Sequence, residues 1–144
     1  MRIVLDAAIV VAAIRSDAGA SHRLLQAALE RRQGLTVLVS VPLLIEYEEV
    51  MTRVQHLKAA RLTIGDVAVL LDALVEVSEP VTLAYLWRPT LPDADDDMVL
   101  EAAVNGRAEA IVTFNVRDFG AAVEKFGIAV LSPGEAVQLL GERQ

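Results

Sequence analysis

The 144-residue chain contains no cysteine, which excludes disulfide bonds, thiolate metal sites and a cysteine nucleophile. It also has no apolar run of the about 18 to 20 residues that a membrane-spanning helix needs. Asp6 interrupts the apolar stretch near the N-terminus that would otherwise resemble the core of a signal peptide. We therefore expect a cytoplasmic protein with no membrane partner.

Basic residues are in the minority, since 13 lysines and arginines stand against 20 acidic residues, for a formal net charge of −7. This balance disfavours a protein that coats nucleic acid non-specifically, because phosphate binding needs positive charge. It still permits an enzyme that acts on nucleic acid with a divalent cation, since the cation would invert the local field. Arg88 and Arg117 lie beside acidic segments, and each is either a phosphate contact or an ordinary surface residue.

Apolar residues make up 54% of the chain, which excludes disorder, and the length favours a single domain over residues 1–144. Short apolar runs alternate with helical patterns. The expected strands are 2–5, 35–39, 81–86, 110–113 and 128–131, and the main expected helices are 20–32, 40–54, 63–77, 96–105 and 132–140. This alternation predicts an α/β fold in which helices flank a parallel sheet of about four to five strands.

Polar residues stand where the predicted strands end, and ligands of such sheets bind at the carboxyl ends of the strands. Asp6 follows the first strand, Thr113 and Asn115 follow the fourth, and Asp118 comes three residues later. A turn residue after a strand is the simpler interpretation of Asp6 taken alone. Carboxylate and amide oxygens from separate segments are, however, the ligands that Mg²⁺ and Mn²⁺ prefer.

Two further acidic features lie on predicted helices. At 100° per residue, Glu46 falls at the border of an apolar arc, where it faces either a cleft or solvent. The arc consists of Leu43, Tyr47, Val50, Met51 and Val54. Four acids crowd into residues 93–97 before the helix near Met98, and helix capping accounts for one or two of them but not for four. We expect Asp96 to face the cleft, and Asp95 or Asp97 to face solvent or cap the helix.

Four segments, taken in order, resemble the PIN domain, and specifically the VapC-like bacterial PIN proteins that act as toxins of toxin–antitoxin pairs. The first segment is residues 3–6 together with the apolar stretch that follows them. The other three are residues 40–50, 86–101 and 111–119. By this resemblance, Asp6, Glu46 and Asp96 fall on acids of the family's metal site. Asn115 stands where many members have an acid, and Asp118 follows it as a substitute for the missing charge.

The resemblance implies a metal-dependent ribonuclease that hydrolyses RNA phosphodiesters. Asp6, Glu46, Asp96 and Asp118 would be its catalytic acids, and these four together with Asn115 would hold Mg²⁺ or Mn²⁺. It also implies an antitoxin protein as partner and a homodimer. The high apolar content adds a physical reason for association, because a small chain of this kind exposes hydrophobic surface.

The chain departs from the family at Ala7 and Ala8, where relatives carry a hydroxyl residue and an asparagine that support the first acid. Loss of such supporting groups commonly costs about 10- to 100-fold in metal affinity or activity. The alternative function is therefore a catalytically weakened PIN-fold module that binds other proteins. If the two missing side chains are dispensable, a backbone group or a residue of segment 111–119 orients Asp6 instead.

Overall fold

The sheet contains five strands in a computed structural model that describes residues 1–84, 94–120 and 125–142, except for the side chains of residues 94 and 95. All neighbouring strands are parallel, in the order β3-β2-β1-β4-β5. The strands are β1 (Arg2–Leu5), β2 (Thr36–Val39), β3 (Glu79–Pro80), β4 (Ala110–Val112) and β5 (Ala129–Leu131). The predicted parallel α/β sheet is thus confirmed.

Strand β1 lies at the centre of the sheet, and the chain builds outward from it in two directions. It first adds β2 and β3 on one side, and later adds β4 and β5 on the other. The order of strands therefore reverses between β1 and β4, where Leu5 pairs with Val112. Crevices for ligands form at such switch points, outside the carboxyl ends of the strands.

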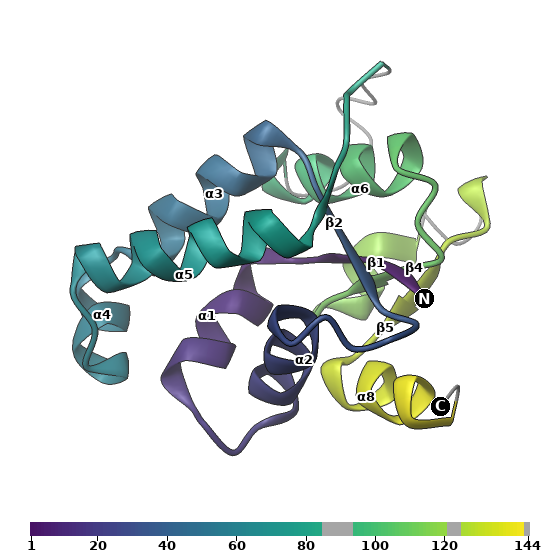
Figure 1. Cartoon of the computed structure of the whole chain (residues 1–144). Helices are drawn as coiled ribbons and strands as arrows, with labels where there is room; N and C mark the ends of the chain where they lie inside the picture. Colours follow the sequence, from purple (N-terminus) through teal and green to yellow (C-terminus); the bar gives the residue numbers. More distant parts are fainter. Residues whose placement is uncertain (85–93, 121–124, 143–144) are drawn as a thin grey trace.

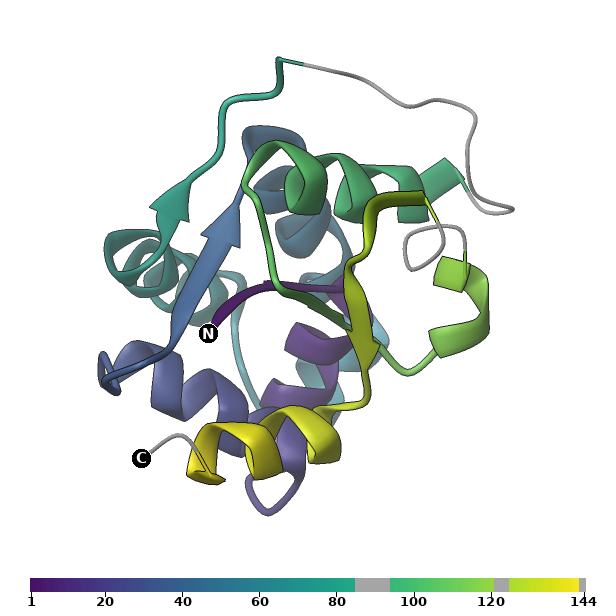
Figure 2. The same ribbon diagram turned by 90° about the vertical axis from the view of Figure 1, so that its right-hand side faces the viewer.

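Helices cover both faces of the sheet. In Figure 1, α3 and α6 lie above β1, whereas α1, α2 and α8 lie below it, and Figure 2 shows the same two layers from the side. The helices are α1 (Ala7–Arg15), α2 (Ala20–Leu29), α3 (Val41–Met51), α4 (Val54–Ala60), α5 (Ile64–Val77), α6 (Ala94–Asn105), the 3₁₀ helix η1 (Val116–Phe119) and α8 (Pro133–Glu142). None of these described helices is both long and apolar enough to cross a membrane.

The starts of α3 and α5 follow from local hydrogen bonding. The Ser40 hydroxyl accepts a hydrogen bond from the backbone N–H of Leu43 at 3.3 Å, so Ser40 caps α3 as its position before Pro42 predicts. Thr63 and Asp66 form a reciprocal capping box at the start of α5, with distances of 2.8 and 3.1 Å. Both predicted helix starts are confirmed.

Several predicted boundaries were wrong, among them the end of the helix predicted over 20–32, since α2 ends at Leu29. The third strand is Glu79–Pro80 rather than 81–86, because α5 ends at Val77 and the chain pairs with β2 two residues later. Residues 81–84 form no strand, and 85–86 lie outside the described residues. Helix α3 ends at Met51, because Arg53 adopts an extended backbone, and Val54 then starts α4 with 63% of its surface exposed. Helix α6 begins at Ala94, two residues early.

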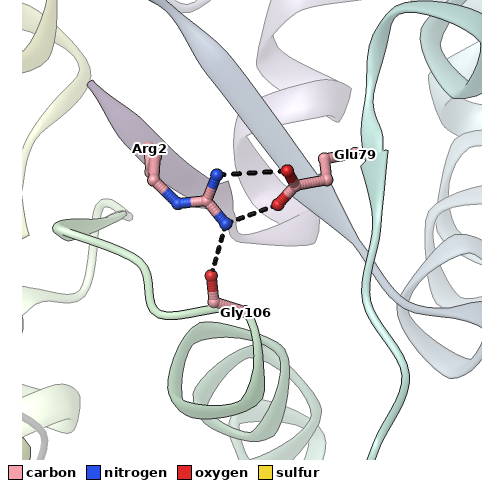
Figure 3. A network of polar contacts seen from close by, with 3 residues as sticks. All are labelled: Arg2, Glu79 and Gly106. Atoms are coloured by element: carbon pink, nitrogen blue, oxygen red, sulfur yellow. Dashed lines mark hydrogen bonds and ion pairs between the residues drawn. The ribbon is translucent and has the colours of Figure 1, made fainter.

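The amino end of the sheet is held by one arginine (Figure 3). Arg2, at the start of β1, donates hydrogen bonds to both carboxylate oxygens of Glu79 in β3 and, at 2.7 Å, to the carbonyl oxygen of Gly106. Since β2 lies between β1 and β3, this side chain links strands that are not neighbours. The opposite end of the sheet is left for the polar residues that follow β1 and β4.

Candidate functional site

Asp6 lies at the switch point between β1 and β4. Its backbone N–H donates to the carbonyl oxygen of Val112 at 3.0 Å, and its own carbonyl accepts from Ile9 at 2.9 Å. The first bond extends the β1–β4 pairing by one residue, and the second starts α1. Only 8% of Asp6 is exposed. The backbone therefore holds this buried acid rigidly from both sides.

Thr113 fixes the side chain of Asp6. Its hydroxyl donates a hydrogen bond to Oδ2 of Asp6 at 2.7 Å, and the same hydroxyl oxygen accepts from the backbone N–H of Asn115 at 3.0 Å. Thr113 is fully buried, and its own N–H bonds Leu131 in β5 at 2.9 Å. The hydroxyl bonded to Asp6 thus belongs to segment 111–119, one of the two alternatives that the sequence left open, and the sequence did not single out Thr113.

Tyr47 connects α3 to the same end of β1. Its hydroxyl donates to the carbonyl oxygen of Leu5, the residue before Asp6. Complete burial raises the pKa of Tyr47 far above its ordinary value, and the negative charge of Asp6 raises it further. The phenol therefore stays protonated and remains a donor. Because Glu46 precedes Tyr47, this bond anchors the helix that carries Glu46 beside the acid at the end of β1.

Glu46 itself is partly buried, with buried Leu43, Tyr47 and Met51 beside it on α3. This matches its predicted place at the border of the apolar arc. Helix α3 packs against both α1, which begins after Asp6, and α6, which carries Asp96. The fold therefore brings the elements of the three predicted acids together at one end of the sheet.

The acids of α6 are more deeply buried than the sequence predicts. Asp96 is 8% exposed, but Asp97 is 1% exposed and Glu101, one turn later, is fully buried. Of the alternatives predicted for Asp95 and Asp97, a solvent-facing Asp97 is therefore excluded. The reason is that α6 starts at Ala94, so Asp97 lies in its first turn, on the side of the helix that faces the protein. Asp93, Arg88 and the side chain of Asp95 lie outside the described part of the structure.

The segment after β4 presents the remaining predicted residues. Asn115 precedes η1 and is exposed, Arg117 is exposed, and Asp118 is partly buried. Helix η1 packs against α6 and β5. This segment therefore lies next to the helix of Asp96, and its exposed amide and guanidinium groups are accessible to a ligand.

A family model of the PIN domain matches residues 2–117, which is most of the chain. The protein belongs to the PIN domain family. A search of curated proteins finds no match to the chain. PIN domains are generally nucleases and usually use divalent metal ions, so nuclease activity is the class of function that membership assigns.

The oxygen donors of this PIN domain fit a hard divalent cation in their chemistry. Asp6 and Asp96 are carboxylates with 8% of their surface exposed, a burial that ionised groups sustain only with compensating partners or a metal. Among the side chains that the structure describes, no group of three or more histidines, aspartates or glutamates is close enough to hold an ion. The assignment of metal ligands to Asp6, Glu46, Asp96, Asn115 and Asp118 therefore stays a prediction.

Proposed function

We propose that this PIN domain is a Mg²⁺- or Mn²⁺-dependent endoribonuclease that hydrolyses RNA phosphodiesters and acts as the toxin of a toxin–antitoxin pair. The observation that carries the proposal is the buried hydrogen bond from Thr113 to Asp6 at the switch point of a PIN fold. A carboxylate fixed in one orientation by a buried donor is a pre-organised ligand, because little is lost when a cation binds to it.

In this proposal Asp6, Glu46, Asp96 and Asp118 would hold the cation, and Asn115 would add a neutral oxygen. When bound, the cation supplies an acidified water and stabilises charge on the leaving oxygen. Thr113 holds Asp6 in place, since its hydroxyl proton is committed to Oδ2. Tyr47 keeps α3 docked on the end of β1, and exposed Arg117 is available to contact phosphate. The acids alone would repel RNA, so we expect binding at this site to need the metal.

The second candidate is a PIN-fold module that binds protein partners and has lost catalysis, and the observation in its favour is the pair of alanines after Asp6. Ala8 is exposed and Ala7 is buried, and neither side chain can form a hydrogen bond. We favour the enzyme because Thr113, directly after β4, donates to the Asp6 carboxylate a hydrogen bond that neither alanine side chain can provide.

The proposed partners are an antitoxin protein and a second copy of the chain. Large apolar side chains are exposed on two helices that pack together: Val41 and Ile45 on α3, and Ile64 and Val69 on α5, each with 61–70% of its surface exposed. Exposed apolar surface of this kind favours association. Light scattering at micromolar concentration checks the homodimer, and a monomer would contradict it.

Single-turnover cleavage of single-stranded RNA, followed against Mg²⁺ and Mn²⁺ concentration, tests the proposed function. We expect cleavage that requires the metal and is nearly abolished by Asp96→Asn. Asp72→Asn is the matched control, because Asp72 is an exposed aspartate of α5, a helix that carries none of the proposed site residues. Calorimetric titration with Mn²⁺ should show the same difference. Metal-independent RNA cleavage, or full activity of Asp96→Asn, contradicts the proposal.

A further inference from the structure

A cavity of about 380 Å³ lies next to the candidate active site, where the starts of α2 and α8 meet the C-terminal half of α1. Phe114 forms part of its wall. Since Phe114 directly follows Thr113, the cavity begins one residue from the group that holds Asp6. Its volume is in the lower range of small-molecule sites, about 300 to 1,000 Å³, and is sufficient for one nucleotide.

Ser21 supplies an uncommitted donor to this cavity. The residue is 5% exposed and lines the cavity, and its hydroxyl forms no hydrogen bond among the residues that the structure describes. Its oxygen is not among the buried unpaired side-chain atoms of the described residues, so solvent in the open cavity can reach it. A ligand that accepts a hydrogen bond inside the cavity would take the place of that solvent.

The start of α2 places further donors beside Ser21. Gly19 and Ala20 also line the cavity, and in this described helix the first turn has no acidic residue and no side-chain cap. The first backbone N–H groups of a helix have no partner within the helix, and its dipole favours an anion at that end. Together with the Ser21 hydroxyl, they form a donor group suited to a phosphate.

At the other helix start in the cavity, that of α8, nearby side chains already accept hydrogen bonds from the backbone N–H groups. At the start of α8, Ser132 accepts from the N–H of Glu135 at 3.2 Å, and the Glu135 carboxylate accepts from the N–H of Ser132 at 3.0 Å. The negative charge of Glu135 would repel an anion there. A phosphate is therefore expected at the α2 side of the cavity and not at the α8 side.

Phe114 offers the group that a nucleobase needs. Phe114 is 54% exposed directly after a buried strand, so its side chain is accessible to a ligand at the wall of the cavity. Proteins that bind single-stranded nucleic acid stack bases on such rings, at about 1–3 kcal/mol per base. Stacking is tolerant of sequence and needs no positive charge, which suits a chain with a net charge of −7.

We propose that this cavity binds one nucleotide of single-stranded RNA, with its phosphate at Ser21 and the start of α2 and its base on Phe114. The assignment to the RNA substrate rests on the proposed function. Because Phe114 of the cavity wall directly follows Thr113, a nucleotide held there would place the neighbouring phosphodiester on the side of Asp6.

Nuclear magnetic resonance titrations in EDTA test the cavity separately from catalysis. The probes are adenosine 5′-monophosphate, adenosine and inorganic phosphate. We expect the nucleotide to shift the backbone amides of Ala20, Ser21 and Asn115 and to bind more tightly than either of its parts. Phe114→Ala and Ser21→Ala should each weaken its binding by about 10-fold, while Phe114→Tyr keeps it. Val116→Ala is the control, because it removes an exposed apolar side chain of the same segment outside the cavity.

The outcomes separate the two proposals. If phosphate binds as tightly as the nucleotide and Phe114→Ala has no effect, the cavity is only an anion site and the inference is overturned. If RNA is cleaved but the nucleotide shifts no amide of the cavity, the inference fails while the proposed nuclease stands. If the nucleotide binds as expected but no metal supports RNA cleavage, the cavity stands as a nucleotide site and the proposed nuclease fails.

Discussion

At the scale of single residues, Thr113 is the side chain on which the candidate site depends most directly. It is fully buried, donates to the Asp6 carboxylate and accepts from the backbone of Asn115, so it connects a predicted acid to the loop after β4. Its hydroxyl holds the Asp6 carboxylate, whereas Ala7 and Ala8 have no side-chain group that could do so. The support for the first acid comes from the neighbouring strand in space, and not from the next residues in the chain.

Thr113→Val tests this role while keeping the shape of the side chain. It removes the hydrogen bonds that the hydroxyl forms with the Asp6 carboxylate and the Asn115 N–H, so we expect a loss of about 1–3 kcal/mol in the free energy of unfolding. Mn²⁺ affinity and RNA cleavage should fall by about 10- to 100-fold. Calorimetry and single-turnover kinetics measure both, and Thr113→Ser, which keeps the hydroxyl, should restore them.

Thr52→Val is the matched control for that variant, since the Thr52 hydroxyl donates only to α3 backbone carbonyls, away from the site. Ala8→Asn provides the opposite comparison, because it returns an amide to an exposed position beside Asp6. We expect its gain in Mg²⁺-dependent cleavage to be much smaller than the loss in Thr113→Val. Wild-type metal affinity in Thr113→Val would show that Asp6 is held without the hydroxyl.

Replacing Asp96 should mainly lower RNA cleavage, whereas replacing Asp97 should mainly lower the stability of the fold. Asp97 is 1% exposed, so we expect Asp97→Asn to lower the free energy of unfolding by about 1–3 kcal/mol while the folded fraction keeps its specific activity. Asp96→Asn should nearly abolish cleavage and leave stability close to that of the wild type. Urea unfolding and cleavage rates, measured on the same preparations, compare the two. Equal losses of activity would contradict this division.

At the scale of elements, the glycine at the end of α6 is needed for the space that its missing side chain leaves, and not for a left-handed backbone conformation. Gly106 follows α6, but the residue with the left-handed backbone is Arg107, at φ 55°. A Cβ on Gly106 would lie 2.8 Å from the carbonyl oxygen of Ala102 and 2.8 Å from Cγ2 of Val81. Gly106 is therefore required for the close approach of α6 to the chain after β3.

Gly106→Ala should consequently destabilise the protein, by about 1–3 kcal/mol, as overpacking in tight interiors usually does. The comparison is Gly65→Ala within α5, where an added Cβ meets only the Thr63 hydroxyl at 3.6 Å. That variant should be neutral or stabilising by up to about 1 kcal/mol, because alanine is the better helix former. Midpoints of urea unfolding measure both, and equal midpoints for the two variants would rule out the steric explanation.

At the scale of the whole molecule, the amino end of the sheet carries structural contacts and the carboxyl end carries the candidate site. The amino end is held by Arg2, Glu79 and Gly106, which join β1, β3 and the chain after α6 (Figure 3). The carboxyl end carries Asp6, Thr113 and the starts of α1 and η1. Because contacts at the amino end hold the strands together, the polar groups at the carboxyl end are available to bind a ligand.

The contact at the amino end gives a dependence of stability on pH. The hydrogen bond from Arg2, and its charge, lower the pKa of Glu79 below the ordinary value. The folded protein therefore binds this proton less tightly than the unfolded chain. The stabilisation is present above the ordinary pKa of a glutamate and is lost as the pH falls through the lowered value.

Glu79→Gln should accordingly lower the melting temperature at neutral pH and reduce the loss of stability on acidification. The effect should be small and should shrink in high salt, because both side chains are partly exposed. Glu48→Gln is the control, since Glu48 is an exposed glutamate for which the described structure shows no ion pair. Melting curves across the acid range measure the difference, and parallel curves for the wild type and Glu79→Gln would contradict the argument.

The sequence by itself determined the parallel α/β fold, the capped starts of α3 and α5, and the family, because local patterns of apolar, capping and acidic residues carry that information over a few turns or strand lengths. It could not predict that Val54 leaves α3 or that Asp97 is buried, since each depends on where a helix begins or ends by one or two residues. Only the tertiary structure decided that Thr113, 107 residues away along the chain, holds Asp6. The physical reason is that β1 and β4 become neighbours only when the sheet assembles, and a hydrogen bond across that pairing leaves no trace in the local sequence.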